Sequence, residues 1–276
     1  MWLLSGSYAG ANNEKSTAMK QPTSSSTAIT ILKDLEEISR QAADEILRRA
    51  DAAKLAAGRF AIALSGGSTP KRLHECLSGE PRVRNRMPWD SIHFFWGDER
   101  HVPPENPQSN YCMARKTLFN AAPVPAQNIH RVPAEDPDAA LCAENYEREL
   151  FSFFGLKPGQ IPRFDCIVLG IGPDGHTASL FPGTDALREK KRLVVANWVE
   201  KLQTHRITLT APVLNNAAMV IFLVSGKEKA DVLREILEGD YRPELFPAQL
   251  IRPQAGKVLW LVDQKAAGCL SNTNQS

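Results

Sequence analysis

The sequence predicts an α/β protein of three layers, in which a parallel-rich sheet has helices on both faces. Apolar, strand-like runs alternate with helical patterns along most of the chain, which is the arrangement of βαβ units. The run FDCIVLGIG, from residue 164, is almost entirely apolar, as expected for a central parallel strand that is covered on both sides. No linker rich in Pro, Gly or Ser interrupts the middle of the 276-residue chain, so we expect one domain.

In the first half, apolar residues at helical spacing with charged residues between them predict a long first helix, and Gly58 stops it. Ser109 suits the N-cap of a later helix, and Gly155 closes another. The predicted elements are a helix over 30–57, a strand over 59–64, a helix after the SGGSTP loop, a strand over 92–96, and helices over 109–119 and 136–154.

The second half continues the alternation. A short helix from His176 to Phe181 is predicted after the central strand, because Pro182 and Gly183 stop it. The other predicted elements are strands over 192–199, 206–210 and 219–226, a helix over 227–239, and a last strand over 257–263.

The ends of the chain differ from its middle. We expect residues 1–27 to be a flexible extension, residues 28–266 a single domain, and residues 267–276 a flexible tail. The first residues lack the basic region of a signal peptide, and no apolar run approaches the ~20 residues that span a bilayer. The cysteine count of five is odd and no pair has C-x-x-C spacing, so a reducing, cytoplasmic environment is predicted.

The charge balance limits the possible partners. With 33 basic and 31 acidic residues, the chain has no bulk electrostatic reason to bind nucleic acid or an anionic membrane. Any affinity for an anion must therefore come from a local site. We expect a small-molecule partner and a monomer or weak dimer.

Four polar loops follow predicted strands. They are SGGSTP at 65–70, GDER at 97–100, GIGPDGH at 170–176 and SGKEKA at 225–230. Ligands of such sheets bind at the carboxyl ends of the strands, so these loops should converge on one site.

The SGGSTP loop has the composition of an anion site. Gly67 allows the backbone to approach a ligand closely, and Ser68 or Thr69 can cap the following helix, whose first turn suits Pro70. The spacing matches neither a Walker loop nor a G-x-S-x-G elbow. A tight turn without a ligand remains the alternative.

Two further loops and one strand contribute charged candidates. In GDER, Asp98 and Arg100 are two residues apart and can share one side of an extended chain, and arginine suits bidentate recognition of phosphate. Arg206 and Lys229 add positive charge near later strand ends. The alternatives are a loop ion pair for GDER and solvated surface cations for Arg206 and Lys229.

The G-x-G-x-x-G spacing of Gly170, Gly172 and Gly175 suggests a dinucleotide-binding turn only at first sight. Such a turn needs a long helix after the glycines and an acidic residue about 20 residues further on. Pro182 leaves room only for a short helix, and Pro173 removes a backbone N–H from the turn. NAD or FAD binding is therefore not expected.

His176, directly after these glycines, has the features of a catalytic base. At the start of a short helix the imidazole would be kept neutral, and neutral histidine is a competent general base near pH 7. Asp174 could orient it or stabilise its charged form. Since no histidine forms an H-x-x-x-H or H-x-E pattern, a metal site is not expected.

Taken in order, LSGGSTP, FFWGDERHVPPENPQSNY, LGIGPDGHTASLFPG and RITLTAPVLNNA followed by VSGKEKA resemble the 6-phosphogluconolactonase family, from about residue 30 to residue 263. The resemblance implies a three-layer α/β fold. It also implies a small-molecule sugar-phosphate partner, with hydrolysis of 6-phospho-D-glucono-1,5-lactone in the pentose phosphate pathway, without a metal or organic cofactor.

The resemblance also implies roles for individual residues. It assigns His176 as the catalytic base, and it assigns substrate contacts to Gly67, Ser68, Thr69, Arg100, Arg206 and Lys229. Asp98 stands where the related glucosamine-6-phosphate deaminases have an acidic residue after the second strand. Those relatives carry a glutamate where this chain has Phe181, which disfavours the isomerase mechanism here.

Three hypotheses follow. The first is a lactonase, and the second is a deaminase or isomerase on the same fold, which Phe181 disfavours. The third is a non-catalytic sugar-phosphate sensor, as in some transcription regulators. The residues before the first predicted helix are too few and too Ser-rich for a helix-turn-helix domain, which disfavours the sensor.

Overall fold

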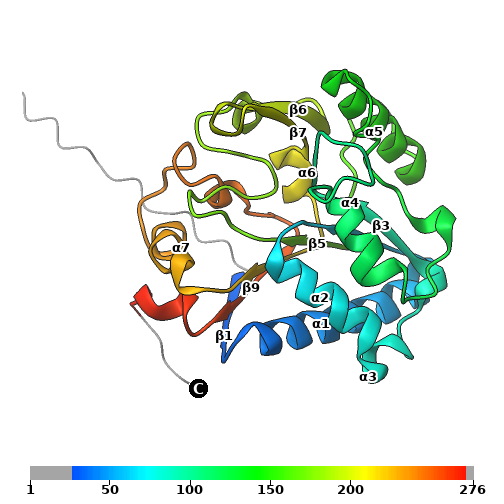
Figure 1. The fold of residues 1–276 in the computed structure, drawn as a ribbon, viewed down its shortest axis with the longest axis horizontal. Helices are drawn as coiled ribbons and strands as arrows, with labels where there is room; N and C mark the ends of the chain where they lie inside the picture. Colours follow the sequence, from blue (N-terminus) through cyan, green and yellow to red (C-terminus); the bar gives the residue numbers. More distant parts are fainter. Residues whose placement is uncertain (1–26, 272–276) are drawn as a thin grey trace, which may run out of the picture.

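The computed structural model describes residues 27–271, and its centre is a six-stranded sheet (Figure 1). The strands of this sheet are β1 (Thr27–Leu32), β2 (Phe60–Leu64), β3 (Ile92–Trp96), β5 (Cys166–Leu169), β8 (Met219–Val224) and β9 (Lys257–Asp263). Their order is β1-β9-β8-β5-β2-β3, and every neighbouring pair is parallel. The predicted parallel-rich sheet is confirmed.

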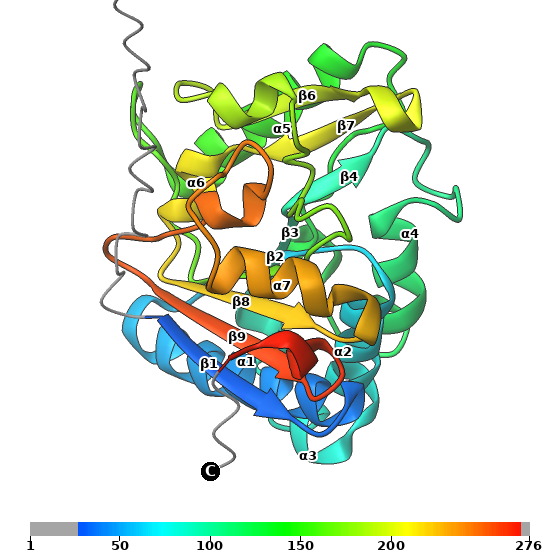
Figure 2. The same ribbon diagram turned by 90° about the vertical axis from the view of Figure 1, so that its left-hand side faces the viewer.

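Helices cover both faces of this sheet. They are α1 (Leu35–Ala57), α2 (Ser68–Gly79), α3 (Pro81–Arg84), α4 (Asn110–Ala114), α5 (Ala139–Phe154), α6 (Ala211–Asn215) and α7 (Ala230–Leu237). Figure 2 shows α1, α2 and α3 below the sheet, with α5 and α7 on its other side.

Neighbouring residues of β3 show how the layers are held together, because successive side chains of a strand point to opposite faces. The Phe94 ring meets Phe119 with ring centroids 5.2 Å apart, next to α4. The Phe95 ring meets Phe153 of α5 on the other face at 4.9 Å. Both strand residues are fully or almost fully buried, so aromatic packing joins the sheet to both helical layers.

A second, smaller sheet lies above the first in Figure 2 and was not expected as a separate unit. Its strands are β4 (Asp98–Arg100), β6 (Val194–Val199) and β7 (Thr204–Leu209), paired antiparallel in the order β4-β7-β6. The GDER motif is therefore mostly a strand rather than a loop. Since α5 packs against β6 and β7, the small sheet is joined to the upper helical layer.

Two of the predicted helices need correction. Residues 30–32 are not helical but belong to β1, which pairs with β9. The helix α1 begins only after Asp34, whose carboxylate accepts a hydrogen bond from the Glu37 N–H at 3.1 Å and so caps the first turn.

The short helix predicted from His176 to Phe181 is also wrong. The segment forms turns, with an isolated bridge between Thr177 and Leu180 and a positive φ of 47° at Ala178. The Thr177 hydroxyl donates to the Gly170 carbonyl at 2.9 Å, which pulls the segment back onto the end of β5 instead of letting it coil onward.

Of the predicted extension over 1–27, only Thr27 lies within the described residues, and it begins β1. Of the predicted tail, residues 267–269 belong to a 3₁₀ turn, η8 (Ala266–Cys269), and residues 272–276 lie outside the description. A single domain over 28–266 stays a prediction. Between residues 27 and 271, no helix combines the length and the apolar character needed to cross a membrane. All five cysteines carry free thiols.

Candidate active site

The polar loops meet at a cavity of about 420 Å³ between the two sheets. Most of the site residues predicted from sequence line it: Gly67, Asp98, Arg100, His176, Arg206 and Lys229. Ser68 and Thr69 are not among its lining residues, since they form the first turn of α2 behind Gly67. Asp174 lies beside His176 and lines a neighbouring cavity.

His176 and Asp174 form a hydrogen-bonded pair. The Nδ1–H of His176 donates to Asp174 Oδ1 at 2.5 Å, and the Lys201 ammonium donates to the other carboxylate oxygen. Burial by itself raises the pKa of the Asp174 carboxyl, but the hydrogen bonds from His176 and Lys201 lower this pKa well below its usual range. Asp174 is therefore a carboxylate that fixes the proton on Nδ1, and this leaves Nε2 as the proton acceptor.

From the sequence, a helix N-terminus was expected to keep the His176 imidazole neutral, but no helix begins there. The hydrogen bond to Asp174 orients the imidazole instead. Two glycines make the pair possible. A Cβ at Gly172 would overlap both the imidazole and the Asp174 carboxylate, so only glycine leaves room for them. Gly175 has a φ of +76° and lies against Phe246, which lets the loop turn and return the His176 ring to the cavity.

Two arginines from neighbouring strands line the same cavity as His176. Arg100 of β4 and Arg206 of β7 are direct register partners. They donate hydrogen bonds to backbone carbonyls of Gln108 and His205, and within residues 27–271 neither forms an ion pair with a carboxylate. Burial, and then the positive charge of Arg100, lower the pKa of Arg206. Two adjacent cations without acidic partners favour the arrival of an anion.

The acidic residues of GDER fix the geometry of this strand. Glu99 is buried and accepts hydrogen bonds from the backbone N–H groups of Arg100, Asn110 and Tyr111 at 2.7–2.8 Å. Because burial outweighs these bonds, the pKa of Glu99 is raised. Asp98 accepts from the Ser179 hydroxyl at 2.7 Å and so ties β4 to the loop that carries His176. The motif is not the loop ion pair considered from sequence.

The SGGSTP loop follows the expected turn but has a different cap. Gly67, with a φ of +106°, is the N-cap of α2, and neither Ser68 nor Thr69 takes that position. Sequence reasoning missed Ser65, which lines the cavity. Its hydroxyl oxygen is buried and has no hydrogen-bond partner among the described residues. A buried hydroxyl without a partner is costly, so a ligand oxygen in the cavity would satisfy it.

Lys201 is the second residue that sequence reasoning missed. It follows β6 in the turn before β7, it lines the cavity, and its ammonium contacts both Asp174 and the Phe181 ring. The sequence VEKLQTH around it matches no motif. Its position between the strands predicted over 192–199 and 206–210, close to Arg206, was the only available signal.

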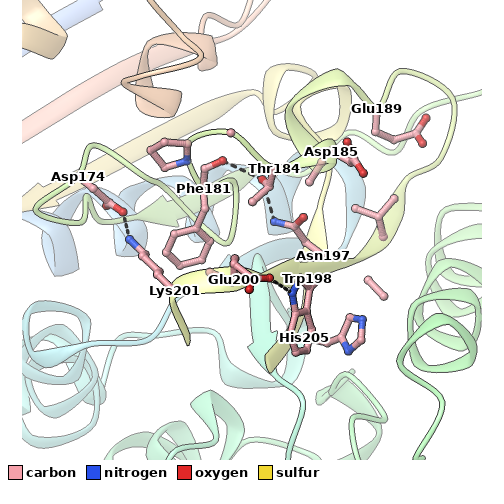
Figure 3. A pocket seen from close by; sticks show the side chains of 16 residues that line it. Asp174, Phe181, Thr184, Asp185, Glu189, Asn197, Trp198, Glu200, Lys201 and His205 are labelled. Carbon is pink, nitrogen blue, oxygen red and sulfur yellow. Dashed lines mark hydrogen bonds and ion pairs between the residues drawn. The ribbon is translucent and has the colours of Figure 1, made fainter. Parts of the chain in front are cut away.

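A second cavity, of about 780 Å³, adjoins the first (Figure 3). The two share Phe181 and Lys201, and Asp174 lines the larger one. The larger cavity is otherwise mostly acidic and apolar, with Asp185, Glu189, Glu200, His205 and Trp198 in its walls. These carboxylates have partners: Asp185 pairs with Arg188, Glu189 accepts from backbone N–H groups, and Glu200 accepts from the Trp198 indole.

One group of possible metal ligands lies elsewhere in the described part of the chain. Glu36, Cys76 and Glu80 approach one another next to α1 and α2. Arg72 and Arg40 form ion pairs with the two carboxylates, and burial raises the pKa of the Cys76 thiol to about 11. Arginines therefore occupy the position that a cation would take, and this cluster is a poor metal site.

Comparison with known proteins agrees with this geometry. Residues 33–260 match the profile of a family described as glucosamine-6-phosphate isomerases/6-phosphogluconolactonase. The chain is 42% identical to a 6-phosphogluconolactonase of Nostoc sp. over 88% of its own length and 98% of the relative's. It is 36% identical to a 6-phosphogluconolactonase of Homo sapiens, over 88% and 93%.

Solved structures agree as well. A structure of 6-phosphogluconolactonase from Trypanosoma cruzi superposes with a TM-score of 0.79 at 31% identity, covering 93% of this chain and 100% of the other. The sequence profile, the identities and the shared architecture lead to one conclusion: the chain belongs to the glucosamine-6-phosphate isomerase/6-phosphogluconolactonase family.

Proposed function

We propose that this protein hydrolyses 6-phospho-D-glucono-1,5-lactone to 6-phospho-D-gluconate, a step of the oxidative pentose phosphate pathway, with His176 as the general base. The observation that carries the proposal is a single cavity lined by His176, which is hydrogen-bonded to the Asp174 carboxylate, and by two adjacent arginines, Arg100 and Arg206. Relatives of high coverage bear the name of this activity.

Substrate binding rests on charge. A phosphate monoester carries about −1.5 to −2 charges at neutral pH. Arg206, Arg100 and Lys229 line the same cavity and would neutralise it. The Ser65 hydroxyl and the backbone at Gly67 add hydrogen-bond donors at the start of α2, where a helix also favours an anion.

The chemical step rests on the His176–Asp174 pair. Nε2 of the neutral imidazole takes a proton from water, and the water oxygen attacks C1 of the lactone. The tetrahedral intermediate then breaks the bond between C1 and the ring oxygen, which leaves as a hydroxyl with the proton returned by His176. Asp174 stabilises the imidazolium between the two steps, as in other carboxylate–histidine pairs. The positive charge of the cavity offsets the negative charge that develops on the carbonyl oxygen.

The deaminase alternative has no comparable support. By the family resemblance, the deaminases place a glutamate at the position of Phe181. In this chain an aromatic ring stacks there on the catalytic histidine candidate, with ring centroids 4.0 Å apart.

The test is an assay of the full chain coupled to 6-phosphogluconate dehydrogenase, with the spontaneous opening of the lactone subtracted. We expect lactone-dependent NADPH formation and no ammonia release from glucosamine 6-phosphate. Ammonia release without lactone hydrolysis would replace the proposal by the deaminase, and absence of both activities would favour the sugar-phosphate sensor.

A further inference from the structure

Phe181 lies at the centre of a set of contacts around His176. It lies in the segment that follows β5, and only 5% of the residue is exposed. Its ring stacks on the His176 imidazole with 4.0 Å between centroids and 28° between planes. The Lys201 ammonium also lies over this ring, 4.7 Å from its centroid. In Figure 3 the Lys201 chain runs beside the Phe181 ring toward Asp174.

These contacts link four side chains in a closed cycle. His176 donates to Asp174, Asp174 accepts from Lys201, Lys201 covers Phe181, and Phe181 stacks on His176. We call these four side chains the clamp. Each is held by two of the others, so the hydrogen bond to Asp174 sets the direction of the imidazole and the stacking on Phe181 sets the plane of its ring.

The clamp also forms the wall between the two cavities. Phe181 and Lys201 line both of them, whereas Asp174 lines only the larger cavity and His176 only the smaller, cationic one. Behind Phe181 there are about 780 Å³ of open space. Without a ring at this position, the partly exposed His176 side chain would gain room to rotate away from the substrate.

We propose that Phe181 is a positioning residue that stacks on His176 and keeps its Nε2 directed into the cationic cavity. The inference rests on the proposed lactone hydrolysis, because its role is to place the base of that reaction. Phe181 takes and gives no proton. Its effect passes through the position of the imidazole, where an error of about 1 Å can cost about 100-fold in rate.

An aromatic ring is required, rather than any apolar side chain of similar size. A flat ring can cover the face of the imidazole and attract the Lys201 ammonium through its π-electrons, whereas a branched aliphatic side chain does neither. Leucine at this position would thus keep the site apolar but lose both ring contacts of the clamp, the stacking on His176 and the contact with the Lys201 ammonium.

The experiment compares Phe181→Leu, Phe181→Tyr and the control Trp198→Leu in the coupled lactone assay. Trp198 is 42% exposed, lines the larger cavity, and has no part in the clamp. We expect Phe181→Leu to lower kcat by about 10–100-fold with little change in KM, since the phosphate site is untouched. Phe181→Tyr keeps an aromatic ring and should therefore keep most of the wild-type kcat. Trp198→Leu should stay within about twofold of the wild type.

A second measurement follows the clamp itself. The Nδ1–H proton shared by His176 and Asp174 should give a downfield ¹H NMR signal in the wild type, in Phe181→Tyr and in Trp198→Leu. The signal should broaden or disappear in Phe181→Leu. If a melting curve shows that Phe181→Leu is unfolded, Phe181→Met, which keeps a similar volume, takes its place with the same expected loss.

Three results would overturn the inference while wild-type hydrolysis is intact: a folded Phe181→Leu with unchanged kcat, a rise in KM alone, or equal loss in the leucine and tyrosine variants. If the wild type does not hydrolyse the lactone at all, the proposed function fails first. The NMR comparison then still decides whether Phe181 holds the imidazole.

Discussion

The cavity that contains His176 and the adjoining larger cavity share two wall residues, Phe181 and Lys201, yet they differ in charge. The smaller, of about 420 Å³, contains Arg100, Arg206, Lys201 and Lys229 with one carboxylate, Asp98. The larger, of about 780 Å³, contains four carboxylates, with Lys201 and His205 as its basic side chains. A doubly charged phosphate ester would be attracted to the first and repelled by the second. Charge and hydrogen-bond geometry, rather than volume, therefore identify the candidate site.

The largest effect should come from replacing the histidine of the smaller cavity, with the histidine of the larger cavity as the control. His176→Asn removes the base while keeping a similar shape, so kcat should fall by about 10²–10⁴-fold with KM largely unchanged. His205→Asn, in the larger cavity, should leave kcat within about threefold of the wild type. Near-normal turnover of His176→Asn in the coupled assay would remove His176 from its assigned role.

The arginine pair allows the next comparison. Arg206→Ala and Arg100→Ala should each raise KM by about 10–100-fold, since a hydrogen bond to a charged group contributes about 1.5–3 kcal/mol. Arg188→Ala is the matched control because Arg188 lines neither cavity and pairs with Asp185 at an exposed position. An unchanged KM in Arg206→Ala would mean that the phosphate binds elsewhere.

Lys201 belongs to the shared wall, and its removal tests how the two cavities are coupled. Lys201→Met should lower kcat by about 10-fold, because Asp174 loses a partner that keeps it ionised and in place. The pKa of Asp174 is lowered in the folded protein, so its ionised form stabilises the fold above the unfolded pKa of about 3.9. This stabilisation is lost as the pH falls through the folded pKa.

Without Lys201, the folded pKa of Asp174 should rise toward its ordinary value, so the stabilisation near neutral pH should be smaller and less of it remains to be lost on acidification. Melting temperatures measured between about pH 2 and pH 7 should therefore be lower in Lys201→Met near neutral pH, and this difference from the wild type should shrink as the pH falls below about 4. Parallel curves would show that Lys201 does not keep Asp174 ionised.

The smallest effect is expected in the acidic cavity. Asp185→Asn removes a carboxylate that is exposed and paired only at the surface, so kcat and KM should stay within about twofold of the wild type. A clear fall in KM in this variant would show that the charge of the larger cavity is felt by the substrate.

The parallel sheet was predictable because its strands are apolar and long enough to recognise. The first strand β1 was missed because it is a partly exposed edge strand directly before a helix, so its apolar residues merged with the helical pattern. The second sheet was missed because β4 has only the three residues Asp98–Arg100. Their pairing with β7, about 100 residues further along the chain, leaves no signal in the sequence around either strand.

The candidate site was also predictable only in part. The glycine spacing drew attention to His176, which does line the cavity. The neutral state of its imidazole, however, was attributed to a helix that does not form. The interactions that replace this helix come from Lys201, which lies in no motif, and from Phe181, which the sequence offered only as the absence of a glutamate. Contacts between distant segments required the folded chain.

The most direct test of the central claim is a crystal structure of His176→Asn with 6-phosphogluconate bound. We expect the phosphate between Arg206, Lys229 and the start of α2, and the C1 carboxylate next to residue 176, with the larger cavity empty of the sugar. A sugar phosphate in the larger cavity, or a phosphate next to residue 176, would contradict the account.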